Sequence, residues 1–184
     1  MRPGILFPAL ALVALAPATA ARAPAPRFDP LVFFEGTSEG DGQLKVLLHK
    51  RQSVRVHSRG HVEPGGTLVL VQRVEQERQP PRTRNWRIRE VAPGRYAGTL
   101  SDAAGPITGE THGSRLHLAF RMKGGLAAEQ WLDLAPDGRS ASNVLTVRKF
   151  GVRVAVLHET IRRTSSGRGT LPTQSPLRAG RQEG

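Results

Sequence analysis

The sequence lacks cysteine altogether, since none occurs among its 184 residues. A chain without cysteine has no disulfide framework, so its core alone must hold the folded state together. The chain also has no cysteine that could take a lipid anchor after removal of an export signal. We therefore expect a mature protein that is soluble and held together by packing.

Aromatic residues and helical patterns are also scarce. Aromatics make up 5% of the chain and hydrophobic residues 38%, so the core has to be built mainly from Val and Leu. The 20 glycines and 14 prolines oppose long helices, because glycine loses most entropy when ordered and proline breaks helix interiors. The sequence therefore points away from a helical fold.

Acidic residues are too few to balance the basic ones. The chain has 27 Lys and Arg against 15 Asp and Glu, which gives a net charge of +12, and its only lysines are Lys45, Lys50, Lys123 and Lys149. Such an excess favours polyanions or an anionic envelope surface as partners. Nucleic-acid binding normally adds stacking aromatics or a recognisable helix motif, and neither is present in this sequence.

The first twenty residues predict an export signal. Arg2 provides a positive start, residues 5–17 are almost wholly apolar, and Ala18-Thr19-Ala20 is a small-x-small cleavage pattern. The apolar run is shorter than the about 20 residues that a membrane-spanning helix needs. We expect cleavage after Ala20, with Ala23 as a second candidate and an uncleaved anchor as the alternative. The mature protein would then be periplasmic or secreted, without a transmembrane span.

Composition divides the rest of the chain into three parts. Residues 21–30, ARAPAPRFDP, form a Pro/Ala tether. Residues 163–184 form a basic tail that is rich in turn formers, and we expect it to be disordered. Between them, residues 31–162 have a suitable length for one small domain.

Apolar and polar residues alternate with period two through most of that domain. The alternation is clearest in SVRVHS (53–58), NWRIRE (85–90), RLHLAFRM (115–122) and VRVAVLHETI (152–161). Successive side chains of a strand point to opposite faces, so the pattern predicts antiparallel strands with one buried face. In the last segment the alternation places Val152, Val154 and Val156 on one face.

Turn signals separate the alternating runs. Examples are Pro93-Gly94, Gly124-Gly125 and Asp137-Gly138. The runs between these turns predict eight to ten strands, and a meander of this length tends to close because an open sheet would expose a long edge. We expect an all-β, lipocalin-like up-and-down barrel, with a β-sandwich as the alternative.

Several short motifs together resemble a family of small bacterial envelope proteins. They are Trp86-x-Ile88, Arg95-Tyr96-x-Gly98, Ser101-Asp102, Gly105, Gly109, Gly113 and Lys149-Phe150-Gly151-x-Arg153. The family is known only as a domain of unknown function with a lipocalin-like barrel, so the resemblance implies a fold over residues 31–162 and no activity. Relatives often carry a lipobox cysteine and additional acidic residues, and this chain departs from them in both respects.

Three patterns that could carry chemistry lack their structural context. Gly36-Thr37-Ser38-Glu39-Gly40 fits the nucleophile-elbow motif G-x-S-x-G, but a turn and a strand follow it instead of a helix. His57 and His61, like His112 and His117, stand near turns without a Cys or Asp that would complete a metal site. The closely spaced glycines between positions 94 and 113 precede strand-like residues, whereas a phosphate-binding loop precedes a helix. We predict no catalytic residue, no metal site and no cofactor.

Four residues remain as ligand-binding candidates. Trp86 and Trp131 are either core or barrel-end residues, or part of the wall of a ligand cavity. Asp102 either stabilises a turn, or orients a ligand or accepts a hydrogen bond from an Arg. Arg153 either points into the lumen, where its planar fork would bind a carboxylate or phosphate, or is a solvated charge on the outer face.

These observations leave three hypotheses about function. The first is an exported, non-enzymatic barrel that binds a small apolar or amphipathic ligand, because a barrel of this size has room for one small ligand. The second is a structural or interaction protein of the bacterial cell envelope that docks on anionic surfaces. A hydrolase ranks last. The ligand and the oligomeric state stay open at this point.

Overall fold

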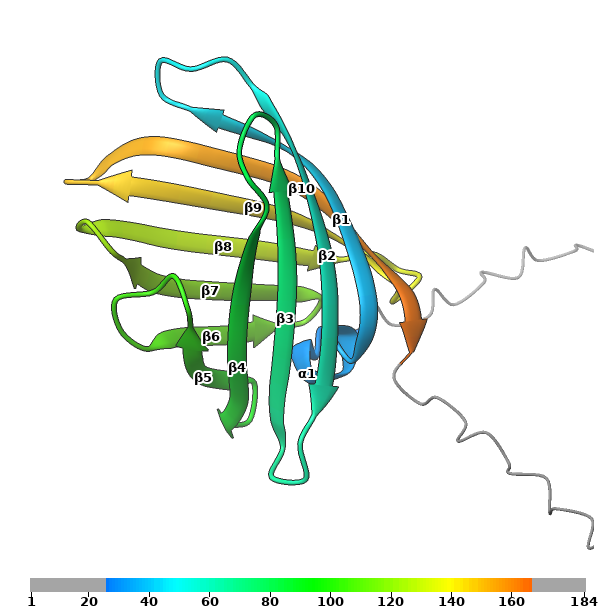
Figure 1. Ribbon diagram of the computed structural model, residues 1–184. Helices are drawn as coiled ribbons and strands as arrows, with labels where there is room; N and C mark the ends of the chain where they lie inside the picture. The colour runs from blue at the N-terminus through cyan, green and yellow to red at the C-terminus, as the bar shows by residue number, and fades with distance from the viewer. Residues whose placement is uncertain (1–25, 167–184) are drawn as a thin grey trace, which may run out of the picture.

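The computed structural model describes residues 26–166, which form one short helix and ten strands (Figure 1). The elements are α1 (Pro30–Phe33), β1 (Gly36–Val46), β2 (Gln52–Val62), β3 (Thr67–Gln76), β4 (Arg82–Ala92), β5 (Arg95–Leu100), β6 (Ile107–His112), β7 (Arg115–Met122), β8 (Leu126–Leu134), β9 (Ser140–Lys149) and β10 (Val152–Ser166). The predicted signal peptide, 1–20, half of the predicted tether and residues 167–184 of the predicted tail lie outside the described residues. Among the described residues, no helix has the length and apolar character needed to cross a bilayer.

The ten strands close into one antiparallel barrel in which each strand pairs with its neighbours in sequence. β10 returns to β1 and completes the ring, with Gly42 opposite Glu159 and Leu44 opposite Leu157. The predicted all-β up-and-down barrel of eight to ten strands is therefore confirmed. The sandwich alternative is wrong, because all ten strands form one closed ring and not two separate sheets.

The barrel has a closed end and an open end, which we define by their turns. The closed end carries α1 and the turns 63–66, 93–94, 113–114 and 135–139, and the open end carries the turns 47–51, 77–81, 101–106, 123–125 and 150–151. In Figure 1, α1 lies against the closed end beside the start of β1. No helix of residues 26–166 covers the open end.

Aromatic side chains seal the closed end. Phe28 and Phe33 are buried, with their rings 5.2 Å apart, and the backbone N–H of Phe28 donates to the carbonyl of Gly113. The side chain of Asp29 accepts hydrogen bonds from the first N–H groups of α1 and so fixes where the helix begins. Residues 26–30 thus belong to the folded domain instead of the predicted tether, because burial of Phe28 anchors them.

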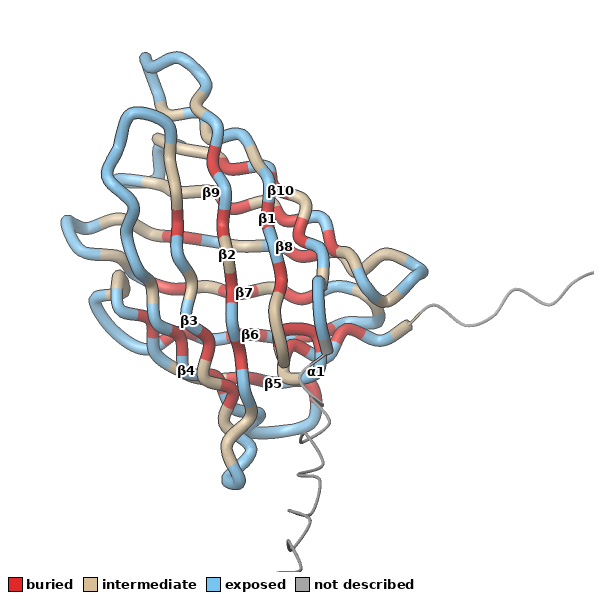
Figure 2. Tube along the Cα trace, turned by 45° about the vertical axis from the view of Figure 1, so that its right-hand side comes forward, coloured by how far each residue is buried: buried red, intermediate tan, exposed pale blue. Residues whose placement is uncertain are grey.

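Burial alternates along the strands, as the sequence predicts (Figure 2). In the closed half, Leu68, Leu116 and Leu132 point inward and are fully buried. Near the open end, the inward-facing side chains of Leu44 and Gln76 are only half-buried. The interior is therefore a packed core at the closed end and accessible to solvent at the open end.

The last strand departs from the alternation that its sequence predicts. A β-bulge between Arg153 and Ala155 shifts the register of β10 against β9. The buried positions after the bulge are Leu157, Glu159 and Ile161. The predicted common face of Val152, Val154 and Val156 is wrong, because the extra residue of a bulge reverses the phase of the strand. β10 also runs to Ser166, past the predicted domain boundary at residue 162.

Candidate functional site

A small cavity lies inside the barrel, with a volume of about 90 Å³. Its apolar wall includes Val54 and Val56 of β2, Val74 of β3, Leu145 of β9 and Leu157 of β10. These strands lie on both sides of the β1–β10 pair, so the cavity exists only because the ring closes. A largely apolar, concave site inside a barrel is a typical place for a small-molecule ligand.

Polar side chains from five strands enter the same cavity. They are Gln72 and Gln76 of β3, Arg82 and Arg84 of β4, Gln130 of β8, Asn143 of β9 and Glu159 of β10. A polar group inside a protein is costly unless it has a hydrogen-bond partner. These residues therefore distinguish the open half of the lumen from the purely packed closed half.

Asn143 and Glu159 form the most deeply buried polar pair. Nδ2 of Asn143 donates to Oε2 of Glu159 across 2.7 Å, and the two residues are 2% and 8% exposed. Oδ1 of Asn143 is buried and has no hydrogen-bond partner within residues 26–166. Burial raises the pKa of Glu159, against the opposing effects of the Asn143 hydrogen bond and the Arg84 charge.

Two glycines of β1 make room for Glu159. A Cβ atom at position 40 would overlap the carboxyl group of Glu159, and one at position 42 would lie 3.0 Å from the Cβ of Glu159. Gly42 is the direct partner of Glu159 in the β1–β10 pair. The inner face of β1 is therefore bare where the Glu159 side chain crosses it.

Arg84 and Asp102 form an ion pair beside the cavity. Nε of Arg84 lies 2.6 Å from Oδ2 of Asp102, and their side chains are 12% and 24% exposed. Burial by itself would raise the pKa of Asp102, but hydrogen bonds from Arg84 and Ser101 and the nearby positive charges outweigh it and lower that pKa. The charge of Arg84 is thus balanced inside the protein.

Arg82 is an exposed residue that lines the cavity without such a balance. No carboxylate of the described part of the chain lies within ion-pair distance of its guanidinium. Burial and the charge of Arg84 lower the pKa of Arg82, while Asp102 acts in the opposite direction. A guanidinium is a planar donor suited to carboxylate and phosphate groups, so Arg82 provides a free binding group for an anion.

Trp86 is held rigidly in the cavity wall. Its Nε1 donates to Oε1 of Gln72 across 2.6 Å, and Nε2 of Gln72 donates to Oγ of Ser58 across 3.2 Å. The indole ring also meets Phe120 edge-on, with the centroids 5.8 Å apart. Of the predicted site residues, Trp86 lines the cavity and Asp102 is held beside it by Arg84.

Trp131 does not reach the cavity. It is 38% exposed on the outer face of β8, where its ring stacks on His117 at a centroid distance of 3.9 Å. The prediction that Trp131 is a core or cavity-wall residue is wrong, because it occupies the phase of β8 opposite to Gln130 and Leu132, which line the lumen.

Arg153 also lies on the outer face. It is exposed and pairs in register with Arg148, whose Nη1 donates to Oε2 of Glu129. Arg153 is therefore a solvated charge on the outer face and does not point into the lumen. The predicted site residues are thus split between the lumen and the outer surface.

Sequence reasoning missed the polar residues of the cavity, among them Arg82, Arg84, Asn143 and Glu159. A signal for one of them is present in the sequence. Arg84 stands two residues before Trp86 and so shares the apolar phase of its strand, whereas Glu159 lies in the phase opposite to Val152, Val154 and Val156. A charged residue in the apolar phase of a strand is the pattern that identifies Arg84.

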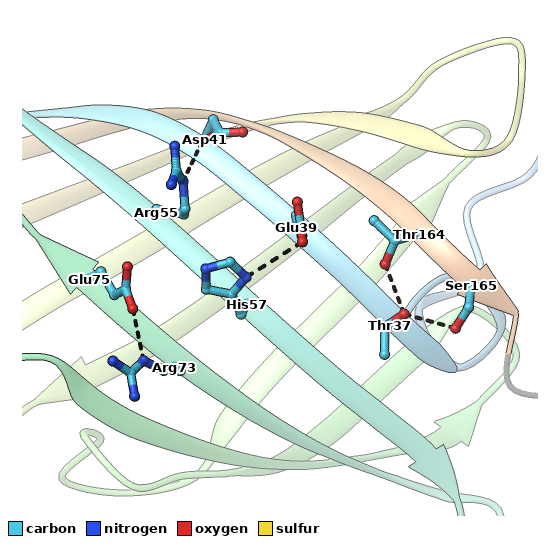
Figure 3. A network of polar contacts seen from close by, with 9 residues as sticks. All are labelled: Thr37, Glu39, Asp41, Arg55, His57, Arg73, Glu75, Thr164 and Ser165. Atoms are coloured by element: carbon cyan, nitrogen blue, oxygen red, sulfur yellow. Dashed lines mark hydrogen bonds and ion pairs between the residues drawn. The ribbon is translucent and has the colours of Figure 1, made fainter.

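The outer face of β1, β2 and β3 carries a polar network of a different kind (Figure 3). Arg55 pairs with Asp41 at 3.2 Å, and Arg73 pairs with Glu75 at 2.8 Å. These side chains are between 38% and 62% exposed, and exposed ion pairs of this type contribute little stability. The network is a solvated surface and does not form a site.

The remaining sequence patterns have structural positions. Ser38 of the G-x-S-x-G pattern is buried within strand β1, and β2 follows that strand after a turn. Within residues 26–166, no group of three His, Cys, Asp or Glu side chains could hold a metal ion.

The chain belongs to the family described as protein of unknown function (DUF3833), which matches residues 9–163. A comparison with curated protein sequences found no match. The matched range covers every strand except the last residues of β10.

Three solved structures share the fold. The crystal structure of Rv2717c from M. tuberculosis has 16% identity and a TM-score of 0.58, covering 72% of this chain and 93% of the other. The S-type phycobiliprotein lyase CPES from Guillardia theta has 9% identity and a TM-score of 0.53, covering 72% and 89%. A DUF3598-family protein of unknown function from Nostoc punctiforme has 10% identity and a TM-score of 0.58, covering 80% and 53%. At these identities the likeness concerns the barrel alone.

Proposed function

We propose that this member of the DUF3833 family binds a small amphipathic molecule inside its barrel and does not catalyse a reaction on it. The observation that carries the proposal is the Oδ1 of Asn143, which has no hydrogen-bond partner among residues 26–166 and is buried in a cavity with a largely apolar wall. A buried acceptor without a partner costs roughly 1–3 kcal/mol. A hydroxyl or amine of a bound molecule would remove this cost by donating to Asn143.

The cavity favours a ligand with a polar, anionic part and an apolar part. Arg82 offers a positive charge that no carboxylate of residues 26–166 balances within ion-pair distance, and Val54 and Leu145 offer apolar contact. The volume of about 90 Å³ holds only a fragment of a typical ligand, because ligand pockets usually measure about 300–1,000 Å³. The rest of the ligand would extend past Leu44 and Gln76 toward the open end.

The fold is compatible with this proposal but does not carry it. One protein of similar fold is named a phycobiliprotein lyase, and at 9% identity that likeness supports the barrel alone. The proposal therefore depends on the cavity and its polar groups.

A fluorescent fatty acid, dansylundecanoic acid, tests the proposal. We expect saturable binding that is displaced by unlabelled fatty acid. Leu145→Phe, which fills the cavity, should weaken binding at least about tenfold, because the apolar part of the probe loses its space. Arg82→Gln should weaken it about fivefold or more by removing the partner of the carboxylate.

Matched controls separate the cavity from the outer surface. Val71→Phe and Arg89→Gln make the same kinds of change at exposed positions on β3 and β4. They should leave the affinity for the probe unchanged. The proposal fails if all four variants bind equally well, or if the wild type binds no probe and native mass spectra of the purified protein show no associated small molecule.

We also propose that the protein acts outside the cytoplasm of a bacterium, in the cell envelope. The support is the arrangement of Arg2, the apolar residues 5–17 and the Ala18-Thr19-Ala20 pattern. Expression of the full chain in a bacterium followed by N-terminal sequencing should give a chain that begins at Ala21. A full-length chain that retains Met1 and stays in the cytoplasmic fraction would refute this proposal.

A further inference from the structure

Bulky apolar side chains project into solvent at two turns of the open end. Leu47 and Leu48 in the β1–β2 turn are 52% and 94% exposed, and Phe150 and Val152 at the β9–β10 turn are 91% and 59% exposed. The described residues include eight exposed large hydrophobic residues, and these four are half of them. We call this set the rim patch.

The rim patch is one surface, because its two turns lie side by side. The backbone N–H of Leu47 donates to the carbonyl of Val154 across 2.8 Å, next to the paired residues Val46 and Ala155. Figure 1 shows the tips of both hairpins projecting at the same end of the barrel. The apolar residues of the two hairpins therefore face the same environment.

The backbone at these tips is poorly suited to apolar residues. Leu48 has a φ of 63° and Phe150 a φ of 51°, which is the left-handed region that glycine and asparagine favour. A turn selected for folding alone would carry one of those two residues at each position. A leucine and a phenylalanine there are strained and also exposed, so stability does not explain their presence.

Basic residues surround the rim patch. Residues 44–52 and 147–155 contain six Lys and Arg, at positions 45, 50, 51, 148, 149 and 153, and no Asp or Glu. In the described part of the chain, Arg148 pairs with Glu129, and the other five have no carboxylate within ion-pair distance. The ammonium group of Lys149 lies 5.7 Å from the centroid of the Phe150 ring.

We propose that the rim patch docks the open end of the barrel on an anionic lipid bilayer. Leu48 and Phe150 enter the headgroup region, and the surrounding basic side chains contact lipid phosphates. A second copy of this chain would bring the same positive charge to the interface and be repelled, whereas an anionic membrane is complementary to it. This inference goes beyond the proposed ligand binding and does not depend on it.

Sedimentation with vesicles tests the docking. The wild type should bind vesicles of equal parts phosphatidylcholine and phosphatidylglycerol, and should bind phosphatidylcholine vesicles far more weakly. The double variant Leu48→Asn/Phe150→Asn should reduce binding to the mixed vesicles by at least about tenfold. Its melting temperature should be unchanged or higher, because asparagine tolerates the left-handed backbone, so loss of folding would not explain the loss of binding.

A matched control uses exposed apolar residues at the closed end. Val32→Asn/Val91→Asn removes two residues that are 56% and 51% exposed and should leave vesicle binding unchanged. The proposal is overturned if Leu48→Asn/Phe150→Asn binds like the wild type. It is also overturned if sedimentation equilibrium shows a wild-type dimer that this double variant abolishes, since the rim patch would then be an interface between copies.

Charge variants test whether the basic side chains around the rim patch contact lipid phosphates. Lys149→Gln/Arg153→Gln should weaken binding to the mixed vesicles about twenty-fivefold, from roughly fivefold per basic residue near the surface. Arg59→Gln/Arg89→Gln removes the same charge from exposed positions away from the rim and should change binding less than about twofold. If both double variants lost vesicle binding equally, the attraction would be nonspecific and the docking site would be overturned.

Binding of dansylundecanoic acid in the absence of vesicles should be unaffected in all these variants. This measurement distinguishes failure of docking from failure of ligand binding.

Discussion

The carboxyl group of Glu159 on β10 occupies the space that a side chain at Gly40 on β1 would need. These two strands meet where the first and last segments of the barrel close the ring. Without a side chain on Gly40, the wall leaves room for a buried acid that Asn143 holds through a hydrogen bond. The closure of the barrel and the polarity of its cavity therefore depend on the same pair of strands.

Glu159 should make stability depend on pH. Burial raises its pKa in the folded protein, so the folded state keeps this proton to a higher pH than the unfolded chain does. Its stabilising contribution is complete below the unfolded pKa and is lost as the pH rises toward the folded pKa. Glu159→Gln cannot ionise, so its melting temperature relative to wild type should increase as the pH rises from about 4.5. Thermal unfolding of both proteins across this range measures the difference, and a gap that does not change with pH would contradict the assignment.

The Arg84–Asp102 pair should contribute more stability than an exposed pair. Asp102→Asn should cost about 2 kcal/mol at neutral pH, because it leaves a largely buried Arg84 without a counter-charge. The pKa of Asp102 is lowered, so its contribution is present above the unfolded pKa and is lost as the pH falls through the folded pKa. Urea unfolding at pH 7 and below pH 4 measures both effects.

The exposed pair of Arg115 and Asp133 provides the control for that prediction. Its closest approach is also 2.6 Å, but its side chains are 56% and 43% exposed. Asp133→Asn should cost less than about 1 kcal/mol. If the two Asp→Asn variants unfold at the same urea concentration, burial does not determine how much each ion pair contributes to the free energy of unfolding.

Adding even a single methyl group at Gly98 should destabilise the barrel. A Cβ at this position would overlap the carbonyl oxygen of Arg87 on the neighbouring strand, and a backbone atom cannot rotate away. Gly98→Ala should therefore destabilise the barrel by about 1–3 kcal/mol. Gly105 lies in the β5–β6 turn with open space around its Cβ position, so Gly105→Ala should change stability by less than about 0.5 kcal/mol. Differential scanning calorimetry of the two variants tests the contrast.

The aromatic side chains that seal the closed end should unfold together with the rest of the barrel. Phe28 is fully buried and lies outside every strand and helix. Phe28→Ala should cost about 3–5 kcal/mol, as for a buried core phenylalanine. Val32, which is 56% exposed on α1, is the control, and Val32→Ala should cost less than about 0.5 kcal/mol. Similar melting temperatures for Phe28→Ala and wild type would show that residues 26–30 are a loosely attached tether after all.

Predictability differed between residues of the same candidate site. Trp86 was found from the sequence because it is a large side chain in the inward phase of a regular run, and it does line the cavity. Trp131 is also a large side chain within a strand, but it lies on the outer face of the barrel. The reason is that pairing with β7 and β9 determines which residues of β8 face the lumen. Glu159 was missed because a charged residue in a strand normally indicates the solvent face.

Alternation along the chain determined by itself that this protein is built of antiparallel strands, since the two faces of a strand require period two whatever surrounds them. Which face points inward was decided only by the tertiary structure. A single bulge before Ala155 reverses the phase of β10, and it is this reversal, together with the pairing of β10 with β1, that places Glu159 inside the barrel. Pairing between the two ends of the domain joins residues that are more than one hundred positions apart, and no local pattern encodes it.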